Sequence, residues 1–119
     1  MTLLLALTIM LVGALAATVR YGISLLLAAQ AGWAVLVVNV AGSAIGGGIL
    51  ALADRAAISG DLRLILLTGL CGGLTTFSTF GVETVQLALA GRVRAALLNV
   101  GANLALGVGA AAGAYLLLR

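Results

Sequence analysis

The residues best able to do chemistry in this chain lie between positions 69 and 80, in the run Gly-Leu-Cys-Gly-Gly-Leu-Thr-Thr-Phe-Ser-Thr-Phe. The run places small residues, hydroxyls and both phenylalanines of the chain inside an otherwise apolar segment. Because lipid offers such polar groups nothing to bond to, they are expected to line a polar path or an interface. This chemistry favours the binding and passage of an ion.

Other polar side chains within the apolar segments are few: Asn39, Glu83, Asn99 and Asn103. Each costs free energy in a membrane unless it finds a partner. Asn99 and Asn103 lie one helical turn apart and share a face, as do Phe77 and Phe80. The asparagines are either interhelical hydrogen-bonding groups or part of a conduction path. The phenylalanines either pack against the core or lipid, or line that path.

The elements that position these residues are membrane helices. Of the 119 residues, 64% are hydrophobic and 8% are charged, and the mean hydropathy is +1.32. An ordinary soluble domain has about 25% charged residues. Apolar runs at or above the roughly 20 residues that cross a bilayer as a helix cover residues 3–29, 33–53, 62–90 and 95–118. The sequence predicts one all-α domain of four transmembrane helices over residues 1–119.

The first run is expected to remain in the mature protein rather than act as a signal peptide. It lacks a basic n-region and is far longer than the about 7–15 residues of a signal-peptide h-region. The connections between the runs are only a few residues long. No extramembrane domain is therefore expected to do separate chemistry.

The third run is longer than one span requires and has adjacent glycines, Gly72 and Gly73, near its middle. Each glycine weakens a helix by about 1 kcal/mol relative to alanine, and nearby hydroxyls can satisfy backbone groups that a break sets free. We expect this helix to be broken mid-membrane near these glycines. Broken helices expose carbonyls and amides that bind cations and anions respectively. The alternative is an unbroken helix whose hydroxyls bond to their own carbonyls four residues back.

The six arginines give no orientation signal, and the chain has no lysine. With four spans they divide evenly between the two sides: Arg55, Arg63 and Arg119 against Arg20, Arg92 and Arg94. A chain without a positive-inside bias has no strong reason to insert one way up. Close helix association is favoured by glycine strips at one-turn spacing: Gly42 with Gly46, Gly69 with Gly73, and Gly109 with Gly113. We therefore expect insertion in both orientations and an antiparallel, dual-topology homodimer.

Taken together, these motifs closely resemble those of the Fluc (CrcB-like) fluoride channel family. The resemblance rests on residues 69–80, on the Asn-Val-Ala-Gly-Ser run that begins at Asn39, and on Arg20 with Tyr21. It covers essentially the whole chain in length, number of spans and motif order. The resemblance implies a dual-topology homodimer with two antiparallel pores, embedded as a multi-pass protein in the bacterial inner (plasma) membrane.

The resemblance also implies a set of residues that line the fluoride pore. Phe77 and Phe80 match the pore phenylalanines of the family, which would present their electropositive ring edges to a passing anion. Asn39 matches the pore asparagine, whose amide can donate a hydrogen bond. Ser78 and Thr79 would supply hydroxyls close to the two rings.

Further roles are implied outside the pore. The backbone carbonyls of Gly72 and Gly73 from both subunits would hold a structural sodium ion on the two-fold axis. Arg20 would make a vestibule attractive to anions, unless it snorkels to the membrane interface. Glu83 matches a family glutamate on a polar track beside the pore.

This chain departs from the family pattern on the fourth helix. Where a tyrosine and, one turn on, a serine are expected, it has Asn99 and Asn103. Both side chains can donate hydrogen bonds, so they continue the polar track in a changed form. One turn before Arg20, Ala16 stands where glycine is usual.

The implied function is a fluoride-selective channel that passively exports cytoplasmic fluoride and so lowers its concentration and toxicity. One rival is a small dual-topology multidrug or cation transporter coupled to protons. Such a transporter needs a membrane carboxylate early in the chain, whereas the first acidic residue is Asp54 and Glu83 is the one candidate. A purely structural subunit is the other rival, and it leaves Asn39 and residues 69–80 unexplained.

No enzymatic activity is expected. The chain has no histidine, a single cysteine at Cys71, no paired carboxylates and no nucleotide-binding loop, so a nucleophile would lack a base. Apart from the implied sodium ion, no cofactor is expected. The expected partners are a second copy of the chain, fluoride, sodium and the lipid bilayer, with no nucleic acid.

Overall fold

The computed structural model describes residues 2–29 and 32–119, and every regular element in these ranges is helical. The elements are α1 (Leu3–Leu26), α2 (Trp33–Asp54), α3 (Gly60–Leu64), η1 (Ile65–Cys71), α4 (Gly72–Leu74), α5 (Ser78–Leu89) and α6 (Val93–Leu118). Within the described ranges, 4 segments are long and apolar enough to cross a membrane: Leu3–Leu26, Trp33–Asp54, Gly60–Leu89 and Val93–Leu118. The prediction of an all-helical protein with four long apolar helices is confirmed. Met1, Gln30 and Ala31, which the expected domain includes, lie outside the described residues.

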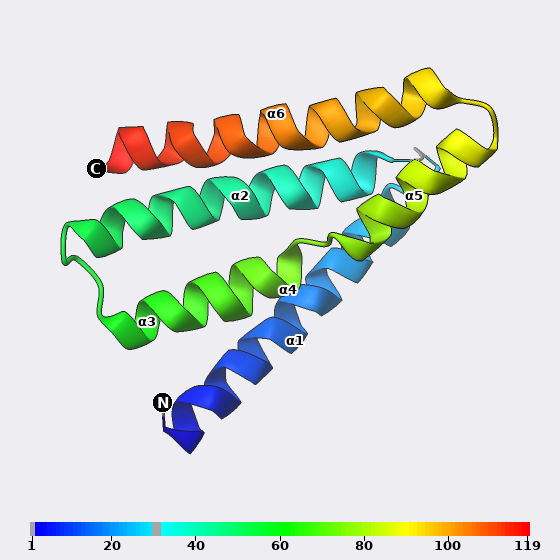
Figure 1. The fold of residues 1–119 in the computed structure, drawn as a ribbon. Helices are drawn as coiled ribbons and strands as arrows, with labels where there is room; N and C mark the ends of the chain where they lie inside the picture. Colours follow the sequence, from blue (N-terminus) through cyan, green and yellow to red (C-terminus); the bar gives the residue numbers. More distant parts are fainter. Residues whose placement is uncertain (1, 30–31) are drawn as a thin grey trace.

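The four spans run up and down, with α2 and α6 side by side (Figure 1). The third span, which begins with α3 and ends with α5, lies on the other side of α2, and α1 crosses it at η1 and α4. The N-terminus, the α2–α3 connection and the C-terminus lie at one end of the bundle (Figure 1). Large apolar side chains remain exposed along α1 and α6, as expected for helices that face lipid or a partner.

Local sequence explains where several helices begin and turn. The Thr2 hydroxyl accepts a hydrogen bond from Leu5 N–H at 3.2 Å at the start of α1. Ser59 caps α3 in the same way. Gly91 has a φ of 75° in the turn between α5 and α6, a backbone conformation that residues with a Cβ rarely adopt.

Glycines bring the helix backbones into close contact. A Cβ added at Gly47 of α2 would collide with the Ala111 carbonyl of α6, and one added at Gly73 would collide with the Gly13 carbonyl of α1. A Cβ at Gly69 would lie 3.0 Å from the carbonyl oxygen of Ile9. The predicted strip of Gly69 and Gly73 therefore packs against α1 within one chain.

The other two strips differ from each other. A Cβ added at Gly42 would collide with the side chain of Thr75, and one at Gly46 would approach Cys71 and Leu67, so this strip packs against the third span. For the strip on α6, no atom of the described residues lies within 4 Å of an added Cβ, at Gly109 or at Gly113.

The backbone conformation of the third span changes along its length. Its backbone hydrogen bonds join residues five apart in η1, a rare geometry that is frequent at functional sites. The helix then ends at Leu74, Thr75 is extended with φ −82° and ψ 159°, and α5 begins at Ser78. We call residues 75–77 the interruption. The chain changes direction there (Figure 1).

The interruption does not fall on the glycine pair. Gly72 and Gly73 are helical residues of α4, and the non-helical residues follow them. Glycine flexibility predicts the weak point of the helix near this pair. The structure instead has a side chain from another helix bonded to the backbone of Thr76, as described next.

Candidate functional site

A single side chain of α2 holds the interruption. Asn39 Oδ1 accepts a hydrogen bond from Thr76 N–H at 2.8 Å, and Asn39 Nδ2 donates to the Thr76 carbonyl at 3.1 Å. Thr76 is only 9% exposed, so its backbone groups need internal partners. Asn39 supplies both partners and so stabilises a non-helical backbone within an apolar span.

A chain of hydrogen bonds continues from Asn39 across three helices. Asn39 Nδ2 also donates to Asn103 Oδ1 at 3.1 Å, and Asn103 Nδ2 donates to the carbonyl and to Oδ1 of Asn99 at 3.0 and 3.2 Å. Asn99 Nδ2 donates to Thr84 Oγ1 at 3.0 Å, and Thr84 Oγ1 donates to the Phe80 carbonyl at 2.8 Å. We call Asn39, Thr84, Asn99 and Asn103 the amide network. It contacts the third span on both sides of the phenylalanine pair.

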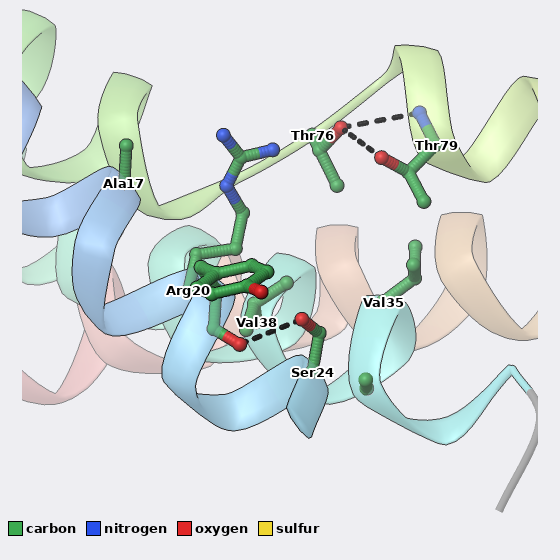
Figure 2. A pocket seen from close by; sticks show the side chains of 9 residues that line it. Ala17, Arg20, Ser24, Val35, Val38, Thr76 and Thr79 are labelled. Atoms are coloured by element: carbon green, nitrogen blue, oxygen red, sulfur yellow. Dashed lines mark hydrogen bonds between the residues drawn. The ribbon is translucent and has the colours of Figure 1, made fainter. Parts of the chain in front are cut away.

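A cluster of hydroxyls lies at the start of α5. Thr76 Oγ1 accepts a hydrogen bond from Thr79 N–H at 3.2 Å and donates to Thr79 Oγ1 at 3.1 Å. It also lies 3.3 Å from Ser78 Oγ. Figure 2 shows the two bonds between Thr76 and Thr79. Thr76 thus acts as a helix cap for α5, and the hydroxyls of Ser78 and Thr79 gather around it.

The two phenylalanine rings are neighbours. Their centroids are 5.8 Å apart and the ring planes are inclined by 51°. Phe77 lies in the interruption and is 84% exposed, whereas Phe80 lies in the first turn of α5 and is half-buried. Phe77 and Ser78 also line an open groove along α5 that ends near Gln86. Phe77 therefore projects away from the rest of its own chain.

A cavity of about 220 Å³ lies between α1, α2 and the start of α5. Its wall includes Arg20 and Ser24 of α1, Val38 of α2, and Thr76 and Thr79. In Figure 2 the Arg20 side chain extends toward the segment that carries Thr76. Among the described residues, Arg20 Nε is buried and has no hydrogen-bond partner. An uncompensated guanidinium beside hydroxyls favours an anion in this cavity.

The remaining predicted residues lie around this centre. Thr76 N–H, which a continued helix would donate to the Gly72 carbonyl, is donated to Asn39 instead, so that carbonyl lacks its helical partner. Gly73 packs against α1. Glu83 is on α5, where its Oε2 is buried without a hydrogen-bond partner in residues 2–29 and 32–119.

The structure joins some of the predicted residues and adds two more. It brings Asn39, Asn99 and Asn103 into one network, although they lie on two helices. Thr76 and Thr84 were not among the predicted site residues. Thr84 could have been found from its position four residues after Phe80, because a threonine there commonly bonds to the carbonyl one turn back. The bonds of Thr76 to Asn39 required the tertiary structure.

Fold and site together define a multi-pass membrane protein with a polar centre built around an interrupted third span. Residues 7–115 match the family model described as CrcB-like protein, Camphor Resistance (CrcB). The chain therefore belongs to the CrcB family, and the resemblance found in the sequence is confirmed.

Relatives in several bacteria are named "Fluoride-specific ion channel FluC". The protein of Thermus thermophilus is 41% identical over 100 residues, which cover 81% of this chain and 80% of its own. That of Clostridium perfringens is 40% identical over 107 residues, covering 86% and 84%. That of Rhodospirillum rubrum is 41% identical over 95 residues, covering 74% of each chain. A channel family is not a class of enzymes.

Proposed function

We propose that this protein is a fluoride-specific ion channel that passively exports fluoride from the cytoplasm across the bacterial inner membrane. The observation that carries the proposal is the interrupted third span, where hydroxyls and two aromatic rings lie next to a backbone segment held by Asn39. This centre occurs in a chain about 40% identical to relatives named as fluoride channels. An inside-negative membrane potential drives an anion outward with about 2.3 kcal/mol per charge per 100 mV, so no cofactor is needed for export.

Fluoride is a small, strongly hydrated anion, so its path must replace the lost water with other donors. The hydroxyls of Ser78 and Thr79 lie at the amino end of α5, where the helix dipole is positive. Phe77 and Phe80 can turn ring edges, the positive part of their quadrupole, toward the anion. Asn39 belongs to the same wall of the pore and holds it in shape.

Two further groups act along the path. Arg20 attracts anions into the cavity beside Thr79, because its buried Nε has no protein partner among the described residues. Asn99 and Asn103 continue the polar track along α6, with Glu83 on the neighbouring helix α5. The carboxyl group of Glu83 has one buried oxygen without a hydrogen-bond partner among the described residues, so it is a further polar group beside this track.

The channel assembles as an antiparallel, dual-topology homodimer in which the third helix is broken mid-membrane. Phe77 is 84% exposed within one chain, an unusual position for a ring that lines a pore unless a second copy covers it. Gly72 is also exposed, and an added Cβ would have no atom closer than 3.7 Å. The even division of the arginines permits both orientations in the membrane.

The carbonyls of Gly72 and Gly73 are proposed to hold a structural sodium ion between the two copies. The residues fit such an ion, because the Gly72 carbonyl has lost its helical partner and carbonyl oxygens at a half-helix end suit Na⁺. When bound, the ion would supply positive charge beside the carbonyl oxygens of Gly72 and Gly73. Gly73 itself allows close contact with α1, because an added Cβ would collide with the Gly13 carbonyl.

The function is tested by ion efflux from liposomes that contain the purified protein. A channel releases fluoride selectively, with no dependence on a proton gradient. Exchange of drug cations for protons would instead support the multidrug transporter and refute the channel. Release of neither solute would favour a structural subunit.

Assembly is tested separately by adding two or three lysines at the C-terminus, which biases insertion toward one orientation. A population in one orientation should lose flux, and co-expression with an oppositely biased variant should restore it. Full flux from a single-orientation population would rule out the antiparallel dimer.

A further inference from the structure

The amide network forms hydrogen bonds with the backbone at both ends of residues 76–80. Asn39 bonds to the backbone N–H and carbonyl of Thr76, directly before Phe77. Thr84 bonds to the carbonyl of Phe80. The two rings lie between these attachment points, so their positions depend on how firmly the network is held.

One backbone N–H sets the direction of this network. Thr76 N–H can only donate, so Asn39 must turn Oδ1 toward it and Nδ2 toward Asn103. Asn103 must then present Oδ1 to Asn39, which turns its own Nδ2 toward Asn99. No amide in this series can flip alone, because a flip would set two donors or two acceptors against each other.

The direction continues to the phenylalanine pair. Asn99 presents Oδ1 to Asn103, so its Nδ2 faces Thr84 Oγ1. Thr84 accepts that hydrogen bond and gives its own hydrogen to the Phe80 carbonyl. The series therefore begins and ends on the backbone of the third span, and its three asparagines lie on α2 and α6.

The bonds also use every amide hydrogen of two of the asparagines. Asn39 Nδ2 donates to Thr76 and Asn103, and Asn103 Nδ2 donates twice to Asn99. Neither side chain can donate to an anion without giving up a bond that orients its neighbour. Their arrangement suits a geometric role better than direct ion binding.

We propose that Asn103 is a positioning residue for the ion path: by accepting the second amide hydrogen of Asn39, it locks Asn39 onto Thr76 and fixes the backbone of residues 76–80. The effect on flux rests on the proposed channel function, whereas the effect on Thr76 does not.

The first test measures amide hydrogen exchange of Thr76 in the full-length protein, labelled with 15N-threonine. Asn103→Leu removes the acceptor for Asn39, and exchange at Thr76 should accelerate about tenfold, as expected for loss of roughly one net hydrogen bond. Asn103→Asp keeps that acceptor and should leave exchange at Thr76 within about threefold of wild type. Wild-type exchange in a folded Asn103→Leu protein would overturn the proposal.

The second test uses a matched pair of threonines and fluoride efflux. Thr84 and Thr18 both donate to the carbonyl four residues back, but only Thr84 also accepts a bond from the network. Thr84→Val should slow flux about tenfold while Thr18→Val leaves it unchanged. Equal flux in the two variants would contradict the proposal, and so would faster exchange at Thr76 without any loss of flux.

The two readouts also separate this proposal from the channel function. If the wild-type protein released no fluoride, the function would fail, and Thr76 exchange would still decide whether Asn103 positions the interruption. If Asn103→Leu does not fold, Asn103→Ala in the exchange experiment provides the same decision, because it also removes the acceptor for Asn39.

Discussion

The α2–α6 pair and the third span satisfy the hydrogen-bonding groups of their backbones in different ways. Along α2 and α6 the helices are uninterrupted and approach so closely that Gly47 lies against the carbonyl of Ala111. In the third span the backbone passes through η1 and then the interruption, where Thr76 depends on the side chain of Asn39. Asn39, which lies on the uninterrupted helix α2, therefore supplies the hydrogen-bond partners that the backbone of the third span lacks at Thr76.

We call the α2–α6 pair the scaffold, and the interruption with its hydrogen-bond partners the site. Asn39 projects from α2 and bonds both to Asn103 of α6 and to Thr76. The α2–α6 part of this arrangement is held in place because those two helices are in close contact. A bulky substitution in the scaffold should abolish folding, whereas a polar substitution at the site should abolish flux in a protein that still folds. The following predictions test that separation.

The largest effect is expected from Gly47→Ala in the regular pair. The added Cβ would collide with the backbone of Ala111, which cannot move aside as a flexible side chain can. We expect a loss of about 3 kcal/mol or more of stability, and little folded protein, on size-exclusion chromatography and circular dichroism. Gly101→Ala on α6 is the control, because no described atom lies within 4 Å of its added Cβ. Equal stability of the two variants would mean that α2 and α6 are not in close contact.

The next largest effect is expected from Asn39→Asp at the site. The acceptor for Thr76 N–H is retained, but an oxygen would replace the amide that donates to the Thr76 carbonyl and to Asn103. Losing these bonds and adding a charge beside an anion path should cost roughly 3 kcal/mol, or about a hundredfold in fluoride flux. Efflux from liposomes that contain folded protein measures this. Near wild-type flux would show that the interruption does not depend on Asn39.

Phe77→Ile and Phe80→Ile should also reduce flux about a hundredfold, because an aliphatic side chain has no quadrupole to offer an anion. Stability should change by less than about 1.5 kcal/mol, since each swap replaces one large apolar side chain by another. Efflux and thermal unfolding, measured on the same samples, separate the two effects. Leu98→Ile, an exposed position on α6, is the control. Unchanged flux in both phenylalanine variants would assign the rings to packing.

The sequence was sufficient for the helices and for three of the polar residues that the structure joins, Asn39, Asn99 and Asn103. Hydropathy predicts long apolar helices because the bilayer sets their length. A polar side chain in such a helix indicates a functional site, because it costs free energy unless it has a partner. The partners of Asn39 could not be predicted, since Thr76 lies 37 positions away and Asn103 lies 64 positions away in the sequence. Such pairings depend on how the helices are rotated and packed.

The exact position of the interruption could not be predicted from the sequence either. Local propensity indicated Gly72 and Gly73, yet these residues are helical and Gly73 serves close contact with α1. The helix ends where a side chain from α2 competes for a backbone N–H. Propensity is a weak guide when a tertiary hydrogen bond of this kind is available.

The smallest effect is expected from Tyr115→Phe, a substitution in the α2–α6 pair. Tyr115 Oη donates to Asp54 Oδ2 at 2.7 Å and joins the ends of α6 and α2, but the contact is exposed. Its loss should cost under about 1 kcal/mol of stability, because water can replace an exposed partner. Fluoride flux should be unchanged, although the variant removes one hydroxyl, as Thr84→Val does. Thermal unfolding and efflux measured side by side decide this. If Tyr115→Phe slowed flux as much as Thr84→Val, loss of any interhelical hydroxyl would suffice, and the distinction between scaffold and site would be wrong.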